Sequence, residues 1–165
     1  MIPTRAIAAA LAVALALPGA AGTLEGRLVT FTVETWDNRD APLFEARGRT
    51  VSVGNGTEFG LGPEGFSGGL DVVPVEVEIG PTRIELSYPS DIGRFHAARF
   101  NGYVLRFETD CALFQNVVID PAATTMKVTE VWAEQGALYI NVSGLGYGPA
   151  ARLALDLEVA DCPMS

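Results

Sequence analysis

Residues 73–88 read VPVEVEIGPTRIELSY, and this stretch decides the fold class. Apolar residues occupy alternate positions from 73 to 79, and again from 84 to 88 on the other side of Gly80-Pro81. Successive side chains of a strand point to opposite faces, so this period of two predicts strands that are buried on one face only. The glycine–proline pair is typical of a turn. The stretch therefore predicts two antiparallel neighbours whose acidic side chains face water.

The same alternation recurs along most of the chain, in short runs separated by Gly, Pro, Asn and Asp. Helical periodicity occurs nowhere at useful length, except in the weak pattern of Asp91 to Arg99. Many short strands with regular turn signals predict an all-β fold, an antiparallel two-sheet β-sandwich of about nine strands. The expected strands are 28–35, 50–53, 73–79, 83–88, 103–107, 114–119, 126–132, 138–142 and 153–159.

A glycine-rich segment interrupts this rhythm. Eight of the 22 residues from Gly48 to Gly69 are glycines. The segment contains no lysine and no helical pattern follows it, which excludes a phosphate-binding loop. We expect a flexible loop between strands, because glycine mainly provides positive φ and close turns. Phe59 and Phe66 are expected to attach that loop to the core.

The first 22 residues predict a secretory signal peptide, followed by a single domain over residues 23–165. Arg5 precedes an unbroken apolar run of 12 residues from Ala6 to Leu17, and small residues then suit cleavage after Ala21 or Gly22. The alternative is a membrane anchor, but the run is shorter than the roughly 17 to 25 residues that span a bilayer. We therefore expect an exported protein, periplasmic or extracellular, whose mature form has no membrane span.

Cys111 and Cys162 are the two cysteines of the chain. In an exported protein an even pair most simply forms a disulfide. A bridge closing so long a loop is expected to stabilise the fold by about 4 kcal/mol. A zinc site is the alternative, but two cysteines and one histidine at unrelated spacings provide too few ligands.

Charge and histidine content narrow the possible functions. The chain carries 20 acidic and 11 basic side chains, with a formal net charge of −9. Nucleic acid is not expected as a partner, because phosphate contacts require a surplus of Lys and Arg. A protein or glycan ligand remains open. His96 is the single histidine, so any mechanism with a histidine base must use it, and no nucleophile motif accompanies it.

Carboxylates give the main catalytic alternative. A glycosidase needs only two of them at a defined separation. Glu58, Glu64, Asp91 and Asp110 lie in predicted loops, but nothing in the sequence selects a pair. A secreted carbohydrate-active hydrolase is therefore the alternative to a non-catalytic protein.

Asp37, Asn38 and Asp40 offer oxygen ligands of the type that calcium prefers. Their spacing lacks the alternation of an EF-hand loop. Such residues are also favoured in turns, where their side chains bind nearby backbone groups. The sequence predicts a turn here, with a weak calcium site as the alternative, and it predicts no other cofactor.

Three short motifs, taken together, resemble a group of exported bacterial proteins that often carry a PEP-CTERM sorting tail. That group shows Gly-x-Glu-Phe, Phe-Asn-Gly-Phe and Asn-x-x-Val-Asn-x-x-Gly-Leu elements. The resemblance covers roughly residues 53–159, and it does not extend to the tail, which reads Asp-Cys-Pro-Met-Ser over 161–165. It implies no activity and no catalytic residues. The matching motifs here are Gly56-Thr57-Glu58-Phe59, Phe100-Asn101-Gly102-Tyr103 and the run from Leu138 to Leu145.

These motifs also have structural interpretations. Asn101-Gly102 suits a turn or bulge with positive φ ahead of the Tyr103 strand. Residues 144–149, rich in glycine, suit a loose connection between the last two strands. Glu58 is the one carboxylate in the motifs, expected either to cap loop amides or to bind a ligand. The sequence as a whole predicts an exported, non-catalytic binding or structural domain.

Overall fold

The structure is a computed structural model that describes residues 22–60, 75–89, 92–128 and 130–164. These residues form thirteen strands and no helix, so no helix in this part of the chain could cross a membrane. The expected signal peptide, apart from Gly22, lies outside the described residues. The strands are β1 (Leu28–Trp36), β2 (Phe44–Glu45), β3 (Arg49–Ser52), β4 (Thr57–Phe59), β5 (Glu76–Ile79), β6 (Arg83–Ser87), β7 (Gly93–Arg94), β8 (Phe100–Phe107), β9 (Phe114–Ile119), β10 (Glu130–Glu134), β11 (Ala137–Asn141), β12 (Gly146–Tyr147) and β13 (Arg152–Val159).

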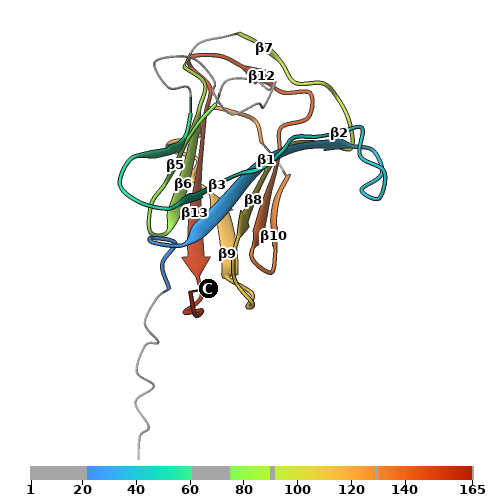
Figure 1. Ribbon diagram of the computed structural model, residues 1–165. Helices are drawn as coiled ribbons and strands as arrows, with labels where there is room; N and C mark the ends of the chain where they lie inside the picture. The colour runs from blue at the N-terminus through green and yellow to red at the C-terminus, as the bar shows by residue number, and fades with distance from the viewer. Residues whose placement is uncertain (1–21, 61–74, 90–91, 129, 165) are drawn as a thin grey trace, which may run out of the picture.

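Two antiparallel sheets pack face to face, which confirms the predicted β-sandwich (Figure 1). The first sheet has the order β10-β11-β8-β1-β2, and β3 pairs with the opening part of β1. The second has the order β4-β5-β6-β13-β9. The short strands β7 and β12 pair with each other at one end of the sandwich. The strand count exceeds the predicted nine because strands of two or three residues are too short to show a period.

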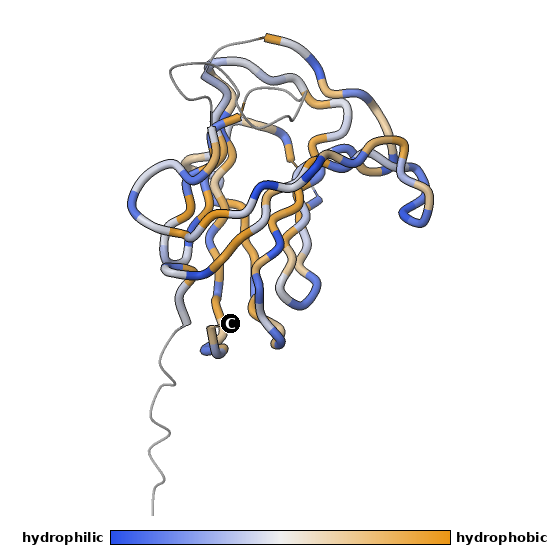
Figure 2. The backbone as a smooth tube through the Cα atoms, viewed as in Figure 1, coloured by the Kyte–Doolittle hydropathy of each residue, from blue (hydrophilic) through white to orange (hydrophobic). Residues whose placement is uncertain are grey.

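The core lies between the two sheets and is built from the alternating positions of the long strands. Hydrophobic and hydrophilic residues alternate along these strands (Figure 2). In β1, the inward residues Val29, Phe31 and Val33 are buried and lie opposite Phe107, Leu105 and Tyr103 of β8. Because the inner face of each sheet is apolar, burying the two inner faces against each other fixes the register of the strands.

The glycine-rich segment is only partly the loop that the sequence predicts. It contains β3 and also β4, which pairs with β5. Phe59 ends β4, is 4% exposed and stacks on Phe31 with ring centroids 5.0 Å apart. This contact attaches the segment to the core as expected. Residues 61–69, with Phe66, lie outside the described part of the chain.

Asn101-Gly102 does not form the predicted turn or bulge. Both residues lie inside β8, and Gly102 is not among the glycines with positive φ. A Cβ atom at position 102 would overlap the carbonyl oxygen of Ile140 in the neighbouring strand β11. The glycine is therefore required by the close approach of two strands and not by a turn. The weak helical pattern of residues 91–99 is also wrong, because its described part contains β7.

The two ends of the described chain meet at the end of the sandwich far from β7 and β12 (Figure 1). The amide of Gly22 donates to the carbonyl of Val159 at 3.0 Å. Cys162 forms a disulfide with Cys111, their Cα atoms lying 6.2 Å apart. Arg27, only 4% exposed, donates to the carbonyl of Cys162 at 2.8 Å. A covalent bond and a buried cation therefore attach the C-terminal segment to the sheets.

Candidate binding cavity

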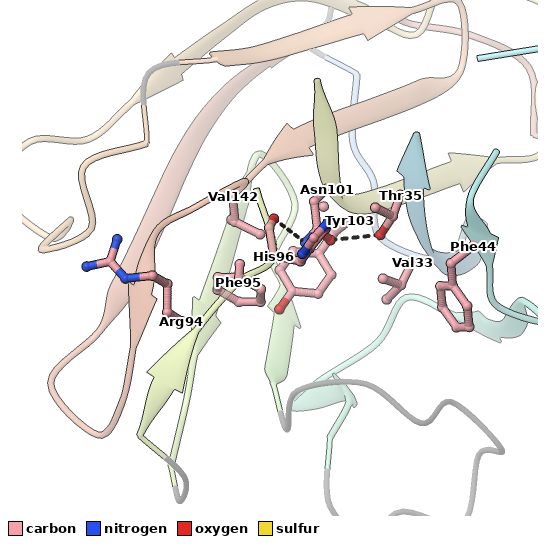
Figure 3. A pocket seen from close by; sticks show the side chains of 10 residues that line it. Val33, Thr35, Phe44, Arg94, Phe95, His96, Asn101, Tyr103 and Val142 are labelled. Atoms are coloured by element: carbon pink, nitrogen blue, oxygen red, sulfur yellow. Dashed lines mark hydrogen bonds between the residues drawn. The ribbon is translucent and has the colours of Figure 1, made fainter. Parts of the chain in front are cut away.

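A cavity of about 240 Å³ lies near the end of the sandwich that carries β7 (Figure 3). It is formed by the last residues of β1, by the first residues of β8, and by the segment that follows β7. These segments come together because β1 and β8 are antiparallel neighbours, so the end of one lies beside the start of the other. The lining residues are Val33, Thr35, Phe44, Arg94, Phe95, His96, Asn101, Gly102, Tyr103 and Val142.

Asn101 organises one wall of the cavity. Its side-chain amide donates to the carbonyl of His96 at 2.7 Å, and its Oδ1 accepts from the Thr35 hydroxyl at 3.0 Å. The backbone amide of Asn101 in turn donates to Oδ1 of Asn141 at 3.3 Å. Asn101 is 8% exposed, and a buried amide is stable only when such partners are present. The side chain thus holds the segment after β7 against the start of β8.

Tyr103 contributes its ring to the wall of the cavity. The residue is 1% exposed, and its hydroxyl oxygen is buried. Its ring stacks on Phe31 at 5.5 Å and meets the edge of Phe95 at 6.3 Å. In Figure 3 the ring lies between Phe95 on one side and Val33 and Phe44 on the other. The aromatic part of Tyr103, and not its hydroxyl, therefore shapes the cavity.

The hydroxyls of Tyr88 and Tyr103 are both buried in this region. Burial is the main cause that raises the pKa of both, and the interaction between the two hydroxyls lowers the pKa of Tyr88 and raises that of Tyr103. Both phenols therefore stay protonated at neutral pH and can donate a hydrogen bond. Tyr88 does not line the cavity, whereas Tyr103 does.

Basic side chains border the cavity. His96 is exposed, and its imidazole makes no hydrogen bond to the described residues. The guanidinium of Arg94 donates to the carbonyl of Gly144 at 2.6 Å and points away from Tyr103 (Figure 3). Of the described residues that line the cavity, none carries a carboxylate.

Glu58 does not line the cavity, and its carboxylate accepts hydrogen bonds from backbone amides. Its Oε1 accepts from the amide of Gly54 at 3.0 Å, and its Oε2 accepts from the amide of Ile79 at 2.7 Å. These contacts join the β3–β4 turn to the end of β5. They match the loop-capping interpretation of this residue, and both carboxylate oxygens are occupied by backbone donors.

Two of the possible calcium ligands also accept hydrogen bonds from backbone amides. Asp37 accepts from the amide of Arg99 at 2.8 Å, and Asn38 accepts from the amide of Asp40 at 3.2 Å, as in an Asx turn. Within the described ranges, no group of three or more His, Cys, Asp or Glu side chains could hold a metal ion. The geometry here is that of the turn which the sequence predicts.

Two of the four carboxylates of the glycosidase alternative, Glu64 and Asp91, lie outside the described residues. Of the other two, neither Glu58 nor Asp110 lines the cavity. Acidic side chains do gather on the outer face of the second sheet, around a hollow of about 140 Å³ that Glu76, Glu78 and Glu85 line. That hollow is smaller than the cavity at the end of the sandwich.

A second aromatic cluster, which the sequence did not reveal, covers the outer face of the first sheet. Trp132 and Tyr139 stack with ring centroids 4.9 Å apart, and Trp36 stacks on Phe100 at the same distance. Arg39 reaches across from the β1–β2 loop, pairs with Glu134 at 2.9 Å, and donates to the Tyr139 hydroxyl. The rings pack on one another, and the guanidinium of Arg39 lies over the Tyr139 ring.

Comparison with protein-family models, with curated proteins and with solved structures gave no match to this chain. The function of the chain is therefore inferred from the residues of its cavity.

Proposed function

We propose that this chain is an exported, non-catalytic binding domain that takes a small ligand, or the end unit of a glycan, in the cavity at the end of the sandwich. The composition of the cavity wall carries the proposal, because the apolar side chains of Val33, Phe44 and Phe95 lie beside the polar groups of Thr35 and His96. Binding sites typically combine apolar walls with a few such polar groups.

Three features support binding over catalysis. The cavity residues that the structure describes contain no carboxylate, whereas glycoside hydrolysis needs two. The Thr35 hydroxyl donates to Asn101, so it is not paired with a base that would activate it as a nucleophile. The one histidine lies at the border of the cavity, and its imidazole has no described partner that would orient it.

Export is supported by the leader-like sequence of residues 1–22 and by the Cys111–Cys162 disulfide. Disulfides persist in oxidising compartments such as the periplasm and the extracellular space. The resemblance to exported bacterial proteins agrees with the same location. We therefore place the binding function in the bacterial envelope or outside the cell.

The test compares two matched variants. Calorimetry against a panel of mono- and oligosaccharides identifies a ligand for the wild-type protein. Phe44→Ala removes the exposed aromatic ring that lines the cavity and is expected to weaken that ligand about tenfold or more, the effect of burying one large apolar side chain. Leu43→Ala removes a neighbouring exposed apolar side chain that does not line the cavity, and it should bind like the wild type. Equal binding by all three proteins, or no ligand in the panel, would overturn the proposal.

A further inference from the structure

The charge around the cavity differs in sign from the charge of the whole chain. Acidic residues outnumber basic ones 20 to 11 overall. The described lining nevertheless includes Arg94 and His96 and no acid. Neither of these side chains forms an ion pair with a described residue, because Arg94 bonds only a carbonyl. The charge of Arg94 is therefore not neutralised within the described part of the protein, and it favours an anionic ligand.

The rest of the lining suits a hydroxylated ring. Phe44 stands at the mouth with 42% of its surface exposed, although large apolar side chains are usually buried. An exposed aromatic face can cover the apolar face of a sugar, while the Thr35 hydroxyl oxygen can still accept a hydrogen bond. The cavity of about 240 Å³ equals the space of roughly eight water molecules, which fits one sugar ring.

We propose that the ligand is a carboxylate-bearing sugar, such as a uronate. Its ring lies against Phe44 and its carboxylate faces the exposed His96, while the charge of Arg94 at the border adds a longer-range attraction. This inference rests on the proposed binding function and names the chemical class of its ligand. The free sugar acid and the uronate end of an acidic glycan share this chemistry.

The probes are methyl β-D-glucuronide and methyl β-D-glucoside, which differ only in the carboxylate. The glucuronide is expected to bind at least about tenfold more tightly in calorimetry, the effect of one charge-assisted contact. His96→Gln and Arg94→Gln should each reduce that ratio. Arg99→Gln changes a nearby exposed arginine that does not line the cavity, so it should leave the ratio unchanged.

The outcomes separate the two proposals. Equal affinity for glucoside and glucuronide would overturn the carboxylate inference and leave the binding function standing. Failure of both probes, together with failure of the wider panel, would overturn both. A tetra-glucuronate then distinguishes the sources: tighter binding than the methyl glucuronide supports a glycan end, and equal binding supports the free sugar acid.

Discussion

Gly102 lies in β8 at a point where the backbone of the neighbouring strand β11 comes very close. Its neighbour across the strands is Asn141, and a Cβ atom at position 102 would overlap the Ile140 carbonyl oxygen. That oxygen belongs to the backbone, so it cannot move aside as a flexible side chain would. The side-chain hydrogen of glycine is thus part of the packing between the two strands, beside the cavity that Gly102 helps to line.

We predict that Gly102→Ala lowers the free energy of unfolding by about 1–3 kcal/mol, the usual cost of overpacking. Gly54→Ala is the matched control, because a Cβ atom there would meet no atom within 4 Å. It should change stability by less than about 0.5 kcal/mol. Urea denaturation of the two variants measures both values. If Gly102→Ala is as stable as the wild type, the strands are further apart than described.

Glu58 gives a second prediction at the residue scale. Glu58→Ala leaves the amides of Gly54 and Ile79 without their acceptors and is expected to cost about 1.5–3 kcal/mol, because both bonds involve a charged group. Glu58→Gln keeps one acceptor oxygen and should cost less. Glu45→Ala, at an exposed position of β2, serves as the control in the same thermal denaturation assay. A Glu58→Ala variant with unchanged melting temperature would contradict the capping role.

The strands differ in how well the sequence predicts them. β6 and β13 show apolar residues at alternate positions, so periodicity identifies them. β2, β7 and β12 have two residues each, and no period exists at that length. β4 lies in a glycine-rich segment, where composition predicts a loop and pairing with β5 decides otherwise. Tertiary pairing therefore determines the short strands, whereas local patterning determines the long ones.

The cavity was predicted less well than the strands. The sequence drew attention to His96 and, through the Phe-Asn-Gly-Tyr motif, to Asn101 and Tyr103. It gave no reason to join them to Thr35 and Phe44, which come from strands more than 50 positions earlier. The antiparallel pairing of β1 with both β8 and β2 brings these groups together. Glu58 also stood out in a motif, and its carboxylate caps two amides away from the cavity.

The outer face of the second sheet carries a cross-strand ion network whose effect depends on pH. Arg83 of β6 contacts Glu85 at 2.5 Å, Asp156 at 2.6 Å and Asp120 at 2.9 Å. The pKa of Asp120 is lowered from 3.8, first by the hydrogen bond from the Ala122 amide and then by Arg83. A carboxyl with a lower pKa in the folded state stabilises the fold above its unfolded pKa. That stabilisation is lost as the pH falls through the folded pKa.

We therefore predict that the melting temperature falls as the pH is lowered below about 4, and that Asp120→Asn makes this decline shallower. Arg83→Gln removes the hydrogen bond and the charge of Arg83 but keeps the larger effect of the Ala122 amide, so it should produce a smaller change in slope. Thermal denaturation between pH 6 and pH 2 measures the three profiles. Parallel profiles for the wild type and Asp120→Asn would show that Asp120 has the same pKa in both states.

At the scale of the whole molecule, the two ends of the sandwich differ: one carries the cavity, and the other carries the disulfide. The cavity lies near β7, whereas the chain ends and the disulfide lie at the opposite end (Figure 1). The second end is held by the Cys111–Cys162 bond, by Arg27 on the Cys162 carbonyl, and by the Gly22–Val159 hydrogen bond. Stability and binding can therefore be tested separately, since a change at one end need not displace the other.

The Cys111→Ser/Cys162→Ser variant tests this separation. The bond joins residues 51 positions apart, and closing a loop of that length stabilises the fold by about 4 kcal/mol in the chain-entropy model. We expect a loss of that order in guanidinium denaturation, and the reduced wild-type protein should show the same loss. Under conditions where the variant remains folded, its affinity for a cavity ligand should equal that of the wild type, because no cavity contact involves either cysteine. A folded variant with weaker binding would show instead that the disulfide end and the cavity are coupled through the sheets.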